Sequence, residues 1–293
     1  MKQYLLPLLA FAFVLSACNK DDSNLTTIPV SEVKDDNQIS IVVRESYVNR
    51  MYIDLLGRKP DETELTQALN ILKLNNSSVT QREKVADIVL AQPEYYNRLY
   101  VFNKQQYLNG VEESDINRAY QQELNLYTLA TQQGDHATAS IYLQRAEALD
   151  LLLETPNNLA AGTLDDKGMH KRMVLNSIYD EINMGVANFT FAVFEGFLFR
   201  APTTEEWAEA QKMCNSQPTT LFGKSGGNKV EFIDIVFNHD HYWEGRVIDA
   251  YVRFVNRQPN TVELYENTVS LKSTNDFKTL YKNILVSDEY FGI

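Results

Sequence analysis

One pattern of residues occurs three times in this chain and constrains where its helices begin and end. It reads apolar-x-Arg-x-Pro-[Asp/Thr/Asn]-x-x-Glu-apolar, and its copies occupy residues 56–65, 198–207 and 255–264. Asp, Thr and Asn are strong N-cap residues, and a Glu three positions later has the spacing of a capping box. The proline before the cap disfavours helix at the residue ahead of it. Each copy therefore predicts a helix end, a turn and a new helix start.

We interpret the residues of this motif as structural. The arginine is expected to pair with the box glutamate, or with the carbonyl groups that end the first helix, where the helix dipole favours a cation. A catalytic Arg–Glu pair is the alternative, but a site installed three times in one chain is rare. The motif residues are Arg58, Pro60, Asp61, Glu64, Arg200, Pro202, Thr203, Glu206, Arg257, Pro259, Asn260 and Glu263.

A second shared element follows each copy of the motif. Residues 89–96, 236–243 and 284–291 each pass from an apolar run through a short polar corner to a pair of aromatic residues. We expect these aromatic pairs to wedge between helices, where each ring buries about 150–250 Å². A platform for stacking sugars is the alternative. The preserved order of the two elements indicates duplication of a supersecondary unit.

Between these elements, apolar residues recur at helical spacing, and glycine and proline are scarce, at 12 and 8 of 293 residues. The spacing predicts helices over 41–56, 63–74, 83–90 and 95–108. The interval between the first and second motif copies is more than twice the next one, which indicates an insertion.

The inserted segment has the pattern of an antiparallel helical hairpin over 113–133 and 136–154, with a Gly-Asp pair between its helices. Residues 155–158 are expected to stop it. A loop over 160–168 and a helix over about 169–199, broken near Gly185, are expected to follow.

The predicted fold is all-α, with three helical repeats in an irregular bundle or short solenoid and an inserted long helical hairpin. Repeat 1 spans residues 41–110, the hairpin insertion and its loop 111–168, repeat 2 169–239 and repeat 3 240–293. Because the hairpin has no counterpart in the other repeats, deletion of 113–154 is expected to spare folding and abolish partner binding.

The first 17 residues have the order of a secretory signal peptide, with one lysine, an apolar run and then small residues. Residues 15–18, Leu-Ser-Ala-Cys, resemble the lipobox of bacterial lipoproteins, which implies lipid on Cys18. Residues 19–22, Asn-Lys-Asp-Asp, are similar to the export signal of surface lipoproteins in Bacteroidota. The resemblance implies an outer-membrane location, with the outer leaflet favoured.

Residues 18–40 are polar and acidic, which favours a flexible tether, with a poorly packed helix from Ser31 as the alternative. The formal net charge of −12 argues against nucleic acid and anionic headgroups as main partners. With Cys18 lipidated, Cys214 stands alone, so neither an intramolecular disulfide nor a cysteine-based metal cluster is expected.

Two short patterns could indicate a metal site or a phosphate-binding site. His239-x-His241 offers two metal ligands, but the equivalent positions elsewhere are not histidines, so we expect no metal and no other cofactor. Residues 223–225, Gly-Lys-Ser, resemble the end of a phosphate loop, but Pro218 stands where its first glycine is required. We therefore expect a flexible loop there.

Residues 47–65, YVNRMYIDLLGRKPDETEL, followed by 82–108, REKVADIVLAQPEYYNRLYVFNKQQYL, are similar to a helical domain of unknown function in planctomycete cytochrome-associated proteins. They also resemble the repeat of phycobilisome-linker-like domains. Neither family implies a catalytic residue. The planctomycete partners often carry haem, but this chain has no Cys-x-x-Cys-His, so haem is not implied.

These features predict a surface-exposed outer-membrane lipoprotein that is not an enzyme. It would act as a scaffold or accessory subunit, held in the bilayer by acylated Cys18 and bound to another envelope protein, such as an outer-membrane β-barrel complex. Binding of glycan or peptidoglycan through exposed aromatic residues, such as Trp207 or Trp243, is the alternative. A hydrolytic enzyme is less favoured, because it needs a cleft with two or more suitably spaced carboxylates.

Overall fold

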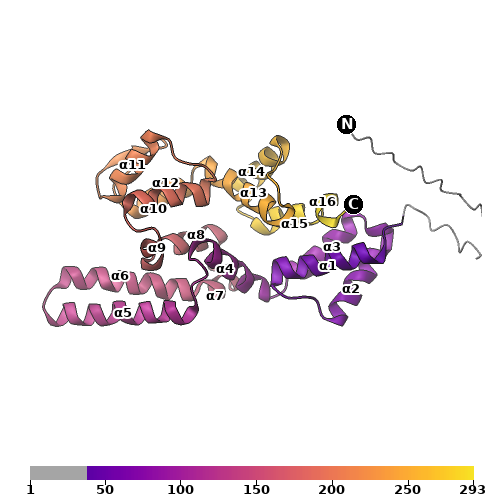
Figure 1. Cartoon of the computed structure of the whole chain (residues 1–293), viewed down its shortest axis with the longest axis horizontal. Coiled ribbons are helices and arrows are strands. Elements are labelled where there is room, and N and C mark those ends of the chain that lie inside the picture. The colour runs from indigo at the N-terminus through magenta and orange to yellow at the C-terminus, as the bar shows by residue number, and fades with distance from the viewer. Residues whose placement is uncertain (1–37) are drawn as a thin grey trace, which may run out of the picture. The chain divides into compact units, whose positions relative to one another are not determined.

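A computed structural model describes residues 38–293 of this chain (Figure 1). The predicted signal peptide, Cys18, the possible helix at Ser31 and most of the tether lie outside the described residues. Apart from two short strands, the regular elements of the described part are all helices, which confirms the predicted all-α fold class. Within this part, no helix is both long enough and apolar enough to cross a membrane.

The first four helices lie close to their predicted positions. They are α1 (Ile41–Leu56), α2 (Glu62–Lys73), α3 (Val79–Leu90) and α4 (Glu94–Tyr107). A 3₁₀ turn, η1 (Leu74–Ser77), joins α2 to α3. Helix α3 begins four residues before its predicted start, because its first turn buries the polar side chains of Gln81 and Arg82. Apolar spacing does not mark such a turn.

The predicted hairpin is present as α5 (Glu113–Gln132) and α6 (His136–Leu153), which lie side by side (Figure 1). Between them, Gly134 adopts a left-handed φ of 75°, and Asp135 caps α6 by accepting a hydrogen bond from the Thr138 N–H. At its base, the side chains of Ile116, Leu149 and Leu152 are fully buried in the core. Deletion of 113–154 would remove these core side chains, so from the structure we expect it to disturb folding rather than spare it.

The hairpin ends where it was expected to end, since α6 stops at Leu153, but the segment after it is more helical than expected. Residues 155–158 begin a new helix, α7 (Thr155–Ala160), in which Pro156 lies in the first turn and lacks only an N–H that is not needed there. Helix α8 (Asp166–Val174) begins inside the predicted loop, because Asp165 caps it by accepting from the Gly168 N–H.

The predicted helix over 169–199 is broken more often than expected. It consists of the last part of α8, then α9 (Ser177–Ile182), α10 (Val186–Val193) and a π-helical segment, η2 (Phe194–Leu198). Asn176 causes the first break, since its side-chain amide donates to the carbonyls of Arg172 and Met173 while its oxygen caps α9. Gly185, with a φ of 87°, lies at the second break, where a break was predicted.

The expected flexible loop at 223–225 is instead part of a small β-hairpin. It follows α11 (Thr204–Cys214) and consists of β1 (Thr219–Leu221) and β2 (Lys224–Gly226), paired antiparallel. Phe222 and Gly223 form its two-residue turn, and both have positive φ, as a tight hairpin turn requires.

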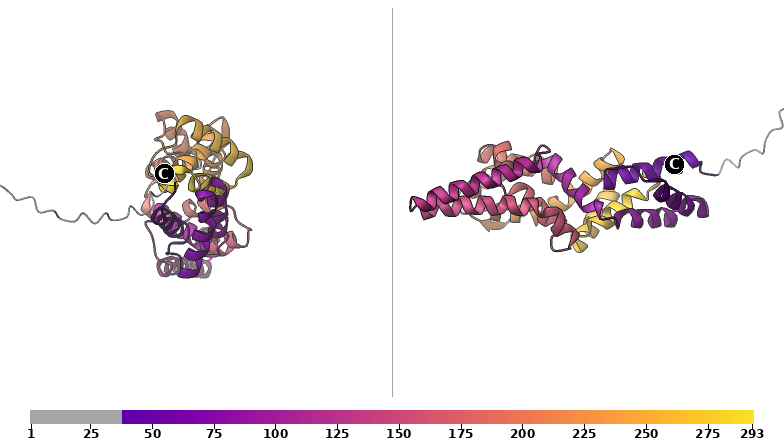
Figure 2. Two further views of the ribbon diagram at one scale, coloured as in Figure 1. Left: turned by 90° about the vertical axis from the view of Figure 1, so that its right-hand side faces the viewer. Right: turned by 90° about the horizontal axis from the view of Figure 1, so that it is seen from below.

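The rest of the chain returns to helices. They are α12 (Lys229–Phe237), α13 (Asp240–Val255), α14 (Thr261–Thr274), α15 (Phe277–Leu285) and α16 (Asp288–Phe291). The last two pack against the first ones, α16 on α1 and α15 on α3 (Figure 2). Among the bonds that join them, the Tyr290 hydroxyl donates to Asp54 at 2.8 Å, and Arg82 pairs with Asp288 at 2.7 Å.

A continuous core of buried side chains runs through these helices, and much of it is aromatic. The fully buried rings are those of Tyr47, Tyr52, Tyr100, Tyr242, Tyr290, Phe194, Phe197, Phe232 and Phe237. The division of the chain into three repeats stays a prediction. One helix, α13, begins at the second polar corner and ends at the third motif copy.

Candidate functional site

At the first motif copy, Arg58 binds Glu64 through two parallel hydrogen bonds of 2.7 and 2.8 Å. Glu64 also accepts from the Asp61 N–H, and Asp61 accepts from the Glu64 N–H, each at 2.8 Å, which completes the capping box of α2. Arg58 also donates to the carbonyl of Lys59 at 3.2 Å. The guanidinium lowers the pKa of the Glu64 carboxyl, so the glutamate serves both arginine and helix in its ionised form.

The second and third copies have the same arrangement. Arg200 binds Glu206 at 2.7 Å through both oxygens, and Arg257 binds Glu263 at 2.7 and 2.8 Å. Thr203 and Asn260 complete capping boxes, and Pro202 and Pro259, like Pro60, directly precede the caps. In all three copies the carbonyl that the arginine reaches belongs to the next residue, not to the end of the preceding helix.

In each motif copy, the residue before the arginine has a left-handed backbone conformation and ends the preceding helix. Gly57, Phe199 and Asn256 occupy this position, with φ of 75°, 51° and 54°. Gly and Asn commonly adopt this conformation at helix ends. The residue type therefore indicates the left-handed conformation at Gly57 and Asn256 but not at Phe199.

The arginine also joins the motif to the polar corner, a contact that was not predicted. Arg58 donates to Glu94 at 3.2 Å, and Arg257 binds Glu289 through Nη2 at 2.7 Å and through Nε at 2.9 Å. Glu94 and Glu289 hold the same position in their corners, and that shared position is the sequence signal for the contact. In the second copy this position is occupied by His241.

The second junction therefore differs from the other two. His241 binds Glu244 at 2.8 Å, and the ring of His239 stacks on Phe222 with centroids 3.9 Å apart. Burial, followed by the proximity of His241, lowers the pKa of His239. Arg200 has its Nε buried with no hydrogen-bond partner among residues 38–293. The described residues contain no group of three or more His, Cys, Asp or Glu side chains that could hold a metal ion.

The aromatic pairs of the corners lie mainly inside the molecule. Tyr242 packs on Phe237, and Tyr290 packs on Tyr47 and Phe254. The corner residues that are buried are Tyr95, Tyr242, Trp243, Tyr290 and Phe291, whereas Tyr96 is half-buried. The buried indole of Trp243 has no surface on which a sugar could stack. Trp207 is 36% exposed and donates its Nε1–H to the carbonyl of Ala187.

A buried polar cluster joins α4, α8, η2 and α13. The ring of His170, on α8, bonds to Tyr242 at 2.8 Å and to Asn103 at 3.0 Å. Nearby, Arg246 donates to the Tyr107 hydroxyl at 2.7 Å and to the Gly196 carbonyl at 2.6 Å. Nothing in the sequence indicated this cluster, because its members come from α4, α8, η2 and α13. Its groups are bonded to one another, which indicates a structural role.

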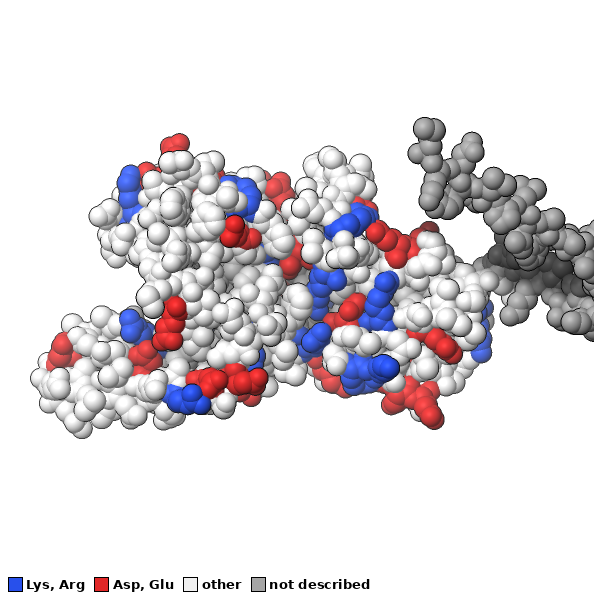
Figure 3. Space-filling view, in the orientation of Figure 1, with Lys and Arg blue, Asp and Glu red and all other residues white. Residues whose placement is uncertain are grey.

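A recess lies between α6, α9 and α12, and Figure 3 shows it as an opening between the hairpin and the α10–α12 elements. It contains two hollows of about 320 and 240 Å³, which share the ion pair of Lys229 with Asp180. The larger is lined by Ile141, Gln144, Arg145, Ala148, Leu175, Asn176, Ser177, Asp180, Lys229 and Val230. Ile141 and Val230 each expose about half of their surface there, at 51% and 54%.

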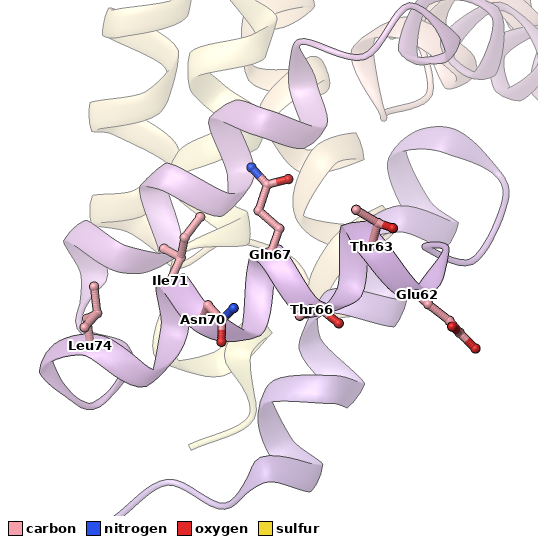
Figure 4. A pocket seen from close by; sticks show the side chains of 7 residues that line it. All are labelled: Glu62, Thr63, Thr66, Gln67, Asn70, Ile71 and Leu74. Carbon is pink, nitrogen blue, oxygen red and sulfur yellow. The ribbon is translucent and has the colours of Figure 1, made fainter.

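A larger hollow, of about 860 Å³, lies along α2 (Figure 4). Its lining residues come from α2 and the adjoining Leu74, so among the described residues it is the open face of one helix rather than a cleft. This hollow has one carboxylate in its described lining, and so does each of the hollows lined by other elements. These carboxylates are Glu62, Asp87, Asp180 and Asp234. None of these hollows thus offers, in its described lining, the carboxylate pair of a glycoside hydrolase.

No protein-family model, curated protein or solved structure matches this chain. The resemblances to bacterial lipoproteins, to the planctomycete helical domain and to phycobilisome-linker-like domains therefore stay predictions from the sequence.

Proposed function

We propose that this chain is a non-catalytic binding protein, anchored in the outer membrane by lipid on Cys18 and exposed at the cell surface. In this proposal its helical body holds another protein of the envelope, such as an outer-membrane β-barrel complex. The observation that carries the proposal is the recess between α6, α9 and α12, because its rim exposes apolar side chains. Exposed apolar surface of this kind commonly marks a partner surface.

The chemistry of the recess suits a protein partner. Ile141 and Val230 supply apolar contact on opposite walls, while the Lys229–Asp180 pair and Arg145 supply polar contact between them. Met184, on the chain between α9 and α10, is 74% exposed, and methionine adapts its shape readily to different partners. Protein interfaces combine an apolar centre with polar groups that select the partner.

The hairpin forms one wall of this recess. Arg145 approaches Glu123 across the two hairpin helices at 4.0 Å, and burial raises the pKa of the Glu123 carboxyl. The insertion that breaks the spacing of the three motif copies thus supplies a surface that the motif copies lack. This is the part of the chain where the sequence led us to expect partner binding.

The test is co-purification from detergent-solubilised outer membranes, using the tagged full chain and a double variant, Ile141→Arg with Val230→Arg. The wild-type chain is expected to bring down a companion at fixed stoichiometry, and the double variant to lose it. The matched control is Val269→Arg, because Val269 on α14 is 51% exposed, as Ile141 is. A chain without a stoichiometric companion, or equal retention by both variants, would contradict the proposal.

The lipid anchor has its own test. Replacing Cys18 with Ser is expected to leave the protein uncleaved and unlipidated, because the lipid is attached to that thiol. Mass spectrometry of the purified N-terminus gives the modification. An N-terminal mass that differs from that of the wild type only by the exchange of sulfur for oxygen would rule out the anchor without bearing on the recess.

Glycan or peptidoglycan binding stays a second candidate, because Trp207 keeps a third of its surface exposed while Trp243 is buried. The chain has 2 tryptophans, so a Trp243→Phe variant leaves Trp207 as the only indole reporter. Saturable fluorescence change on addition of peptidoglycan fragments would support this function. An unchanged fluorescence over the titration would rule out this function.

A further inference from the structure

We infer that the second junction binds a carboxylate group of a partner protein's Asp or Glu side chain, held by Nε of Arg200 beside the imidazoles of His239 and His241. The same place is filled from within the chain at the other two junctions, by Glu94 and Glu289. The site is separate from the recess between α6, α9 and α12, and the inference does not depend on that recess.

The three arginines provide an internal comparison. Each binds its box glutamate with two hydrogen bonds, but Arg58 and Arg257 also hold a second carboxylate. Arg257 shows where Nε points in a filled junction, since that atom donates to both oxygens of Glu289 at 2.9 Å. A junction of this kind is therefore built to take two carboxylates.

At Arg200 the second carboxylate is missing. Its Nη1 and Nη2 are used by Glu206, and its Nε is buried without an acceptor among the described residues. Buried donors are nearly always paired, and an unpaired one is commonly met by a ligand, an ion or water. The rings of Phe194 and Phe222 lie over this guanidinium, with centroids 5.5 and 6.0 Å from its central carbon, so a carboxylate reaches Nε only when Phe222 moves aside.

The acids closest in sequence to this junction are already engaged. His241 holds Glu244 at 2.8 Å, and Asp240 pairs with Lys272 at 2.5 Å. Neither acid is therefore free for Arg200, which leaves the second position to the carboxylate of a partner. A guanidinium presents N–H groups in a planar fork that matches the two oxygens of a carboxylate, so this ligand fits better than a chloride or a neutral amide.

The β1–β2 hairpin covers this junction in place of the second carboxylate. It brings Phe222 to within 6.0 Å of the guanidinium carbon of Arg200, and the ring lies against His239. Phe222 has a φ of 52°, which is uncommon for a bulky residue. A hollow of about 340 Å³ borders Phe222 and His239 and is also lined by Lys224 and Asp234.

The chain has 4 histidines, so ring signals of the ¹⁵N-histidine-labelled full chain can follow binding. The probe is N-acetyl-glutamate amide at constant ionic strength. We expect saturable shifts of the His239 and His241 ring signals. The signals of exposed His136 and buried His170 are expected to stay in place. Tighter binding of glucuronate or inorganic phosphate than of the blocked glutamate would overturn the assignment to a protein carboxylate.

The most informative variant supplies the second carboxylate from within the chain itself. His241→Glu restores the residue found at the other two corners, so it should abolish the saturable response and raise the melting temperature. His241→Gln removes the imidazole without adding a carboxylate, and should raise neither. Arg200→Lys keeps the charge but loses the fork, so affinity should fall about tenfold. His136→Glu is the matched control for the added charge. An unchanged response in His241→Glu would overturn the inference.

Discussion

The ring of His170 lies 2.8 Å from the hydroxyl of Tyr242 and, on its other side, 3.0 Å from the side-chain oxygen of Asn103. Through these bonds one buried imidazole connects α8 to α13 and α4. Burial lowers the pKa of His170 well below its ordinary value, followed by the effect of the Arg246 charge. The ring is therefore neutral in the folded protein.

This relationship predicts a loss of stability in acid. An unfolded histidine takes up a proton near pH 6.5, whereas folded His170 does not, so the free energy of unfolding should fall as pH drops below about 6.5. The contribution of His170 alone should approach a slope of about 1.4 kcal/mol per pH unit. Because Asp166 contributes the opposite slope below about pH 7, the His170 slope is read as the difference in stability between wild type and His170→Gln. Urea unfolding of wild type and His170→Gln between pH 7.5 and 5 measures it. The variant should be less stable but lack this slope, and His136→Gln, at an exposed position, should keep it.

Asp166 should act in the opposite direction. Burial, followed by the charge of Asp165, raises the pKa of its carboxyl to about 7, and its Oδ1 has no hydrogen-bond partner within the described part of the chain. Because the unfolded carboxyl loses its proton near pH 4, stability should fall as pH rises from about 4 to 7. Asp166→Asn should remove this loss and stabilise the protein at pH 8, measured by melting temperature. Asp150→Asn, at an exposed position on α6, removes the same charge and should have little effect.

The capping box of α14 should contribute measurably to stability. Asn260 accepts from the N–H groups of Val262 and Glu263, at 2.9 and 3.0 Å. Asn260→Ala should lower the free energy of unfolding by about 1 kcal/mol, because it leaves these two groups to water. Asn260→Asp should retain the cap. Glu266→Ala, an exposed change in the same helix, should stay within about 0.5 kcal/mol of wild type, and a larger loss there would contradict the assignment to capping.

The outer part of the hairpin should be removable and its base should not. Residues 124–130 and 138–144 lie opposite one another, and removing both takes about two turns from each helix while keeping its face in register. This shortened chain should fold cooperatively with the wild-type core but lose the partner, because Ile141 and Gln144 line the recess. Complete deletion of 113–154 removes buried Ile116, Leu149 and Leu152 and should unfold the region around α8. Cooperative thermal unfolding of the complete deletion would contradict this assignment of the base to the core.

The sequence by itself determined the features that depend on near neighbours along the chain. The bounds of α1 and of the hairpin, the three capping boxes and the Arg–Glu pairs could all be predicted, because a cap and its partners lie within three residues and the arginine within six. Helical spacing of apolar residues is likewise a local signal. Of the two breaks between α8, α9 and α10, only the one near Gly185 was predicted. The other was not, because an asparagine such as Asn176 inside a helical pattern can either continue a helix or end it.

Only the tertiary structure decided which distant groups meet. His170 reaches Asn103 and Tyr242, and Arg246 reaches Tyr107, because four separate elements pack around them. The motif shows that Arg200 has a box glutamate, but only the folded chain shows that its Nε is buried and unpaired next to Phe222. Pairing across large sequence separations depends on how helices pack, and no periodicity along the chain records it.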